Sequence, residues 1–426
     1  MHRPRPLRSN LRKSLAEALL AVPYVQIVNP THFLVVAVLT QHLGLGPGVF
    51  GFIVALPSLC AMLQSFASPG LTARLGARRT SLVLQALDLC VWVIALLSLP
   101  WLGNAGTGAA TLFFLVIFMA SQGVRAVNRV ANPSWTCEWL PAKVRGSFFG
   151  NRNGWCTLVL IIFAIAVVPL LKKEDSWTVY QIFLALAVVM KAGSLLLQSK
   201  IRTPPARTRA ELGPQMPGLA APGSAKWRAF FNRGRPFIIF TALIGLVGVF
   251  RSIISPFRSL YLLQEVGFSA AVLAEFAVVE LCVTAAAYPL WVWVGRRAGF
   301  TFVLRLTVFA FALEALAWAL MPGTSVAGFA ILRGVGALIL AGFGLAMFTL
   351  QLNLIPKVNG ATYLSLAVAL EALCGSVSPI VFGMILNETD RSAAIYKTAF
   401  LIASAGLAFA ATLFWRHSRN NRIPLP

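Results

Sequence analysis

Residues 69–79, with the sequence PGLTARLGARR, form a short basic loop between two apolar runs, 47–68 and 79–100. Each run is long enough for a helix that crosses a bilayer, which takes about 20 mostly apolar residues. Glycine, proline and arginine together favour a turn at a membrane surface. This stretch therefore predicts a hairpin of two transmembrane helices.

The same alternation of apolar run and polar loop continues along the 426-residue chain. Its mean hydropathy is +0.78, 58% of its residues are hydrophobic and only 12% are charged. A soluble domain could not bury that apolar share in one core, so the solvent of these runs must be lipid. We expect an all-α integral membrane protein with twelve transmembrane helices. The expected spans are 17–40, 47–68, 79–100, 109–131, 149–171, 176–198, 236–262, 270–294, 299–321, 325–350, 362–386 and 393–415.

Basic residues gather in alternate loops. The more acid-rich side holds only Lys172, Lys173, Arg391 and Lys397, and every other loop cluster of Arg and Lys falls on the opposite side. By the positive-inside rule that opposite side is cytoplasmic, and an even number of spans places both termini there. The net charge of +23 follows this pattern. It predicts contact with the anionic inner leaflet of a lipid bilayer, in a multi-pass protein of a bacterial inner membrane, and no nucleic-acid partner.

The chain divides near its middle. Residues 199–235 are rich in Pro, Gly and Arg and are expected to form a cytoplasmic linker, because such a composition cannot bury a core. The linker would join an N-terminal six-helix bundle, 1–198, to a C-terminal one, 236–426, that ends in a short cytoplasmic tail. Short motifs recur in the same order in both halves, which predicts a parallel repeat. The matched motifs are 41–44 with 264–267, 76–79 with 295–297, and 141–146 with 356–360.

The sequence carries no motif of an enzyme or a cofactor site. It contains no HExxH, no GxxxxGK[ST] and no GxSxG, and its six cysteines lack CxxC spacing. We expect no catalytic residues, no cofactor, no metal and no disulfide. The basic N-terminus lacks a cleavage site and is expected to be retained as the first helix.

The loop quoted first resembles the signature of the major facilitator superfamily. Arg74, Gly76 and Arg78 keep its register, whereas Ala73 stands at its usual Asp position, Pro69 at its first Gly position and Ala77 at an Arg position. The loop after the fourth run, NPSWTCEWLPAKVRGSFFGNRNGW, is also similar to bacterial members of this superfamily. The resemblance implies two six-helix bundles around a central cavity, alternating access, and a gating role for Arg74, Gly76 and Arg78 at the cytoplasmic face.

Ionisable residues inside the spans are costly, by about 2.5 to 3.5 kcal/mol each, so each needs a partner or a function. Counting residues from the turns places three opposite charges at matching depths. The predicted pairs are Arg258 with Glu275, Arg251 with Glu280, and Glu314 with Arg333. All three pairs are explained by helix packing alone, and for the last pair we favour that interpretation.

The seventh run has a functional interpretation as well. Arg251, Ser255 and Arg258 are spaced to share one helical face and could grip an anionic solute together with Arg333. In the resembling family this span borders the cavity. Glu280 is then the first candidate for a proton carrier, ahead of Glu275.

Further candidates lie elsewhere in the spans. Gln26, Asn29 and His32 form a polar strip around Pro30, where we expect a kink, and either solute binding or packing explains them. Lys191 is expected to extend to the membrane surface. The remaining candidates are Gln122 and Arg125 for the solute, with Asp88 as a pairing partner of Arg125, and Asp88, Glu314 and Glu371 for proton coupling.

These features favour a secondary active transporter that moves a small solute, anionic if the arginines bind it, in exchange for or together with protons. We expect a monomer. The alternative is a non-transporting receptor or lipid-handling protein on the same scaffold.

Overall fold

The computed structural model describes residues 5–102, 106–202, 232, 234–322, 325–355, 360–388 and 392–420. These residues are almost entirely helical, and the chain separates into two compact units. Unit 1 comprises residues 1–45 and 59–220, and unit 2 comprises residues 46–58 and 221–426. The predicted linker at 199–235 falls mostly on residues outside the described part.

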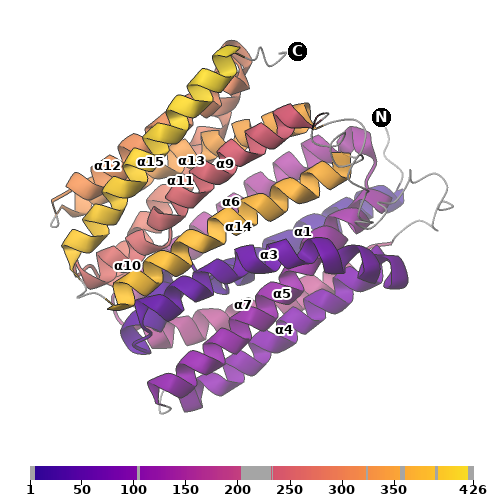
Figure 1. Ribbon diagram of the computed structural model, residues 1–426. Helices are drawn as coiled ribbons and strands as arrows, with labels where there is room; N and C mark the ends of the chain where they lie inside the picture. Colours follow the sequence, from indigo (N-terminus) through magenta and orange to yellow (C-terminus); the bar gives the residue numbers. More distant parts are fainter. Residues whose placement is uncertain are drawn as a thin grey trace. The chain divides into compact units, whose positions relative to one another are not determined.

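Unit 1 is built from long helices that lie alongside one another (Figure 1). Helix α4 packs on α5 and α7, and α1 packs on α7 and α6. The elements are α1 (Arg5–Ile27), α2 (Phe33–Ala37), the π-helical turn η1 (Val38–His42), α3 (Pro47–Leu75), α4 (Ala77–Leu102), α5 (Thr107–Trp139), α6 (Ala142–Leu171) and α7 (Ser176–Ser199). The first turns of α3 are grouped with unit 2.

Unit 2 has the same kind of architecture. Helix α12 packs on α15 and α13, α11 packs on α13, and α9 packs on α14 and α15. The elements are α9 (Arg235–Ile254), α10 (Phe257–Gln264), α11 (Ala270–Ala298), α12 (Phe300–Leu320), α13 (Val326–Leu354), α14 (Gly360–Glu388) and α15 (Ala393–Asn420).

The outward faces of these helices are apolar. Leu97, Val189 and Ile331 are 62%, 69% and 68% exposed, which a water-facing surface would not tolerate over whole helices. In the described part of the chain, ten helices are long and apolar enough to cross a membrane. The other two predicted spans, 17–40 and 47–68, correspond to α1 with α2 and η1, and to α3. The chain is therefore an integral multi-pass membrane protein.

Local chemistry explains where the helices end. The predicted kink at Pro30 is confirmed, because α1 stops at Ile27 and α2 starts at Phe33. Asp175 caps the N-terminus of α7, and the side chain and backbone of Thr178 donate to its carboxylate and hold its pKa below the usual range. Gly76 precedes α4 with φ +80°, in the left-handed region that only glycine adopts freely.

Candidate functional site

A proline divides the seventh predicted span and sets the orientation of its arginines. Helix α9 ends at Ile254 and α10 starts at Phe257, with Ser255 and Pro256 between them. Proline has no N–H to continue the helical ladder, so the hydrogen bonds are interrupted there, while Ser255 and Pro256 keep right-handed helical dihedrals. The side chains of Arg251, Ser255 and Arg258 all line one pocket, as expected of residues that share a helical face.

Four charged residues of unit 2, Arg258, Glu280, Glu314 and Arg333, form a connected cluster, called the charge cluster below. Arg258 reaches Glu280 and Glu314 with N–O distances of 3.4 Å each, and Arg333 Nε lies 2.8 Å from Glu280 Oε1. Glu314 and Arg333 are 9% and 4% exposed. The four residues come from four different helices, α10, α11, α12 and α13.

The pairs in this cluster differ from the predicted ones. Glu280 contacts Arg258 and Arg333 instead of Arg251, and Glu314 contacts Arg258 instead of Arg333. Matching depth was necessary but not sufficient, because the rotation of each helix about its own axis decides which side chains face each other. Glu275 lies five residues before Glu280 on α11, about 140° around the helix from it.

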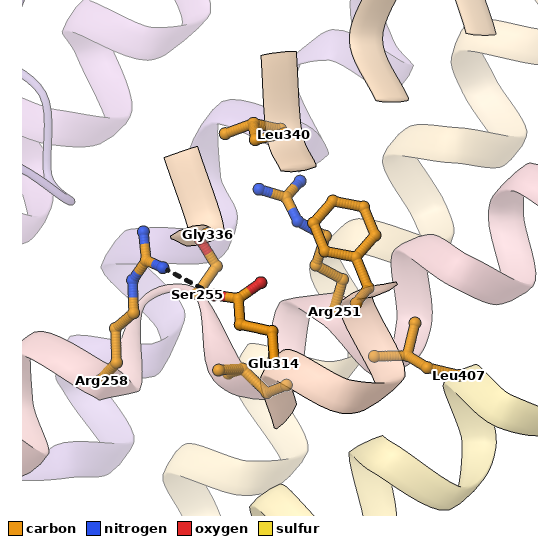
Figure 2. Close-up of a pocket in the computed structure, with 9 residues that line it drawn as sticks. Arg251, Ser255, Arg258, Glu314, Gly336, Leu340 and Leu407 are labelled. Atoms are coloured by element: carbon orange, nitrogen blue, oxygen red, sulfur yellow. Dashed lines mark hydrogen bonds and ion pairs between the residues drawn. The ribbon is translucent and has the colours of Figure 1, made fainter. Parts of the chain in front are cut away.

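Beside the charge cluster lies a small pocket (Figure 2) with a cavity volume of about 20 Å³. This is little more than the space that one water molecule needs. The Arg251 guanidinium lies over the Phe311 ring, 4.9 Å from its centre. Gly336 lines the opposite wall, where a Cβ atom would collide with the Glu314 carboxylate. The full lining is Arg251, Ile254, Ser255, Arg258, Phe311, Glu314, Gly336, Leu340 and Leu407.

Another acid inside a predicted span of unit 2, Glu371, has a neutral partner. Its Oε1 accepts a hydrogen bond of 3.2 Å from Gln351 Nε2, which joins α14 to α13. Counting from the turns gave no indication of this partner, because that count matched only opposite charges and Gln351 is neutral.

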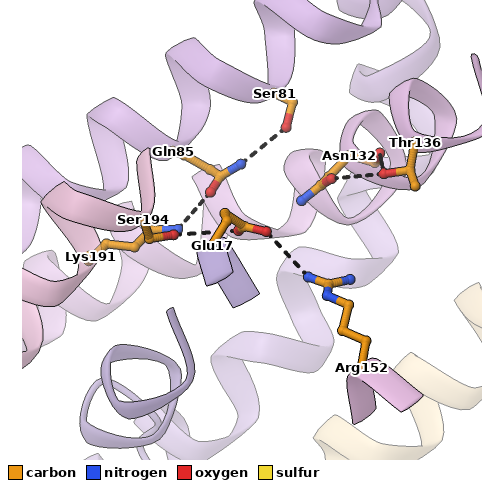
Figure 3. A network of polar contacts seen from close by, with 8 residues as sticks. All are labelled: Glu17, Ser81, Gln85, Asn132, Thr136, Arg152, Lys191 and Ser194. Atoms are coloured by element: carbon orange, nitrogen blue, oxygen red, sulfur yellow. Dashed lines mark hydrogen bonds and ion pairs between the residues drawn. The ribbon is translucent and has the colours of Figure 1, made fainter. Parts of the chain in front are cut away.

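In unit 1 a second polar network crosses five helices, α1, α4, α5, α6 and α7 (Figure 3). Glu17 of α1 lies 3.5 Å from Arg152 of α6 and accepts a hydrogen bond from Ser194 of α7. Lys191 of α7 donates to Gln85 of α4 over 2.6 Å. The prediction that Lys191 extends to the membrane surface was therefore wrong, since its side chain is only 6% exposed. Gln85 continues the network to Ser81, and Ser81 to Asn128.

The sequence did contain a signal for this network. Glu17 opens the first predicted span and Lys191 lies inside the sixth, and a charge in a span needs a partner. Residue depth alone could not connect them, because their helices are far apart in the sequence. Glu17, Gln85 and Arg152 were missed for this reason.

Asp88 forms a separate buried arrangement. It is 4% exposed and accepts a hydrogen bond of 2.6 Å from Ser121, which in turn accepts one from Trp92. Arg125 is a charged neighbour of Asp88, as expected from the sequence. Gln122, the other candidate on α5, is buried, at 3% exposed.

The polar strip at Pro30 is used mainly for local structure. The Asn29 side chain accepts hydrogen bonds from the backbone and hydroxyl of Thr31, and so shapes the break between α1 and α2. His32 stacks at a tilt on Phe33 with the ring centres 4.3 Å apart. Gln26 lies half-buried one turn before the break. The geometry favours the packing interpretation for Asn29.

The signature loop contacts the end of another helix. Arg78 Nη2 donates to the Ser199 carbonyl at the C-terminus of α7 over 2.8 Å. Two residues of α1 bind the backbone just after the same helix end. Lys13 donates to the carbonyl of Lys200, and the Asn10 side chain donates to the carbonyl of Arg202 and accepts from its N–H. Arg74 is exposed, and Gly76 provides the sharp turn.

Comparison with known proteins gives a consistent result. A family model described as Major Facilitator Superfamily matches residues 26–382. A D-xylose-proton symporter aligns with a TM-score of 0.71 at 14% identity, over 96% of this chain and 97% of that chain. The nucleoside transporter NupG aligns with a TM-score of 0.65 at 14% identity, over 97% and 99%. A bacterial homolog of the human lysosomal transporter Spinster aligns with a TM-score of 0.64 at 13% identity, over 98% of both chains. No curated protein sequence matches the chain.

Proposed function

The chain belongs to the Major Facilitator Superfamily, and from this premise we propose that it is a secondary active transporter that couples a small solute to protons. It binds no cofactor and catalyses no reaction. It works as a monomer made of two six-helix halves, 1–198 and 236–426, joined by the linker at 199–235. One structural neighbour is named a D-xylose-proton symporter, which supports proton coupling.

The observation that carries the proposal is the sharing of Arg258 and Arg333 in the charge cluster. Glu280 holds both arginines while it is ionised, and Arg258 also contacts Glu314. A proton on Glu280 removes its charge, so Arg333 loses its acid and Arg258 turns to Glu314. Because the four residues lie on four helices, one proton changes the contacts of α10, α11, α12 and α13 together.

The solute-binding candidates lie in both halves. In unit 2 they are Arg251 and Ser255, beside the charge cluster, and an anionic solute suits their chemistry. In unit 1 they are Gln26, His32, Gln122 and Arg125. Glu275, Glu371 and Asp88 are secondary candidates for proton sites.

Uptake into proteoliposomes tests proton coupling. Labelled sugars, nucleosides, amino acids and carboxylic acids are supplied with and without an imposed pH gradient. We expect gradient-driven uptake of at least one of them. Glu280→Gln should lose the response to the gradient but keep solute exchange at equal pH, because the neutral side chain mimics the protonated state.

The matched control is Glu388→Gln, the same change at an exposed position at the end of α14, which should keep its gradient response. If Glu280→Gln also keeps it, Glu280 is not the coupling residue. If solutes bind but none crosses the membrane, the protein is the non-transporting receptor or lipid-handling protein instead.

A further inference from the structure

Arg251 differs from Arg258, the other arginine in the lining of the pocket. The charge cluster contains two arginines and two glutamates and is neutral by itself. None of the ion pairs among the described residues includes Arg251. Its one close partner is the face of Phe311, and Glu314, its charged neighbour, is in contact with Arg258. The pocket therefore has one positive charge without a contacting counter-charge.

An intramembrane arginine without a contacting acid costs free energy, so its presence calls for a functional explanation. A charged arginine inside a membrane protein normally pairs with an acid or lines a path for an ion or solute. The guanidinium is rigid and planar, and its parallel N–H groups match the two oxygens of a carboxylate. Ser255 adds a hydroxyl to the same pocket, one helical turn away.

The apolar part of the pocket lining restricts the chemistry of the part of the ligand beyond its carboxylate. Ile254, Leu340, Leu407 and the Phe311 ring are apolar. The cavity of about 20 Å³ admits a head group but no larger body in this conformation. A second negative charge on the ligand would lie against either the Glu314 carboxylate or the apolar side chains of the lining.

We propose that Arg251 is the receptor for a single carboxylate, and that the solute is an organic monocarboxylate with an apolar or aromatic body. This inference rests on the proposed function, since it names the solute class of the same transporter. Arg258 and Arg333 hold the proton-responsive acids, and Arg251 holds the solute.

Thermal unfolding of the purified full-length protein in detergent tests the assignment. The probes are benzoate and aliphatic monocarboxylates of increasing length, each paired with its amide as a neutral isostere. We expect carboxylates to stabilise the protein and amides to bind more weakly. Arg251→Gln should weaken carboxylate binding by about tenfold to a hundredfold, the value of a charged hydrogen-bonded contact.

A matched control is Arg297→Gln. Arg297 also lies over an aromatic ring, that of Trp293 at 4.2 Å, but it is exposed, lies in the last turn of α11 and does not line the pocket. This variant should bind carboxylates as the wild type does.

A second measurement needs no ligand. Without a bound anion, Arg251→Gln should unfold at a higher temperature than the wild type, because it removes an uncompensated charge. Arg258→Gln should unfold at a lower temperature, because it leaves two acids without their shared partner.

The proposal is overturned if no carboxylate stabilises the wild type, if amides bind equally well, or if Arg251→Gln binds carboxylates unchanged. Failure of the transporter hypothesis gives a different result. In that case carboxylates still bind through Arg251, but no gradient drives their uptake.

Discussion

Gly336 shows how a single hydrogen atom in place of a side chain maintains the charge cluster. A Cβ atom at this position would collide with the Glu314 carboxylate, and it would come within 3.4 Å of Arg258 Nη1. Both groups are held by partners on other helices, so neither can move away freely. The glycine is therefore required for the contact between Arg258 and Glu314.

We predict that Gly336→Ala lowers the free energy of unfolding by about 1 to 3 kcal/mol, the usual cost of overpacking a close contact. Thermal unfolding in detergent measures this. Gly344→Ala is the control on the same helix α13, where nothing lies within 4 Å of the added atom. That variant should match or exceed the wild type, because alanine favours helix. Equal destabilisation of both variants would contradict the argument.

At the scale of elements, the end of α7 is held by donors from two other segments. Its last carbonyl groups have no intrahelical partner, and Arg78 and Lys13 supply hydrogen bonds to Ser199 and Lys200. Asn10 both donates to and accepts from the backbone of Arg202. The loop at residues 69–79 and the first turns of α1 thus hold the C-terminal end of α7 and the residues that follow it, up to Arg202.

We predict that Arg78→Ala loosens this helix end at a cost of about 1 kcal/mol, because an exposed charged hydrogen bond is lost. Hydrogen exchange should become faster in the last turn of α7 while the middle of the helix stays protected. Arg79→Ala removes the neighbouring exposed charge and should leave exchange unchanged. If both variants exchange alike, Arg78 anchors only the topology of the loop.

Two equivalent turns support the internal repeat. Gly44 and Gly267, matched by sequence, have φ values of +64° and +79°. The hydrogen bonds around them correspond as well: Leu43 to Val38 in unit 1 and Val266 to Tyr261 in unit 2. The second matched motif needs a correction. Gly299, not Gly295, has the positive φ that corresponds to Gly76, because Gly295 lies within α11 against Phe300.

For the whole molecule, the arrangement of basic loops predicts that both termini lie on the cytoplasmic side of the membrane. In a cysteine-free variant, Lys173→Cys between α6 and α7 should react with a membrane-impermeant thiol reagent in intact cells. Arg79→Cys should react only after permeabilisation, or in inside-out vesicles. The reverse pattern would invert the proposed orientation.

The sequence by itself determined the lipid environment, the positions of nearly all membrane-crossing helices, the break at Pro30 and the turn at Gly76. These are local properties, set by hydropathy along one run and by the φ angles that proline and glycine allow. It also identified Arg251, Arg258, Glu280, Glu314 and Arg333 as charges that need an explanation.

Only the tertiary structure decided which of these charges meet. Pairing depends on how far each helix is rotated about its axis, and that rotation is set by side-chain packing against several neighbours at once. Arg258 therefore serves two acids, Lys191 is buried beside Gln85, and Arg251 is left with an aromatic ring. A count of residues from a turn gives the depth of a side chain in the membrane, but only the packing of the helices fixes the direction in which that side chain points.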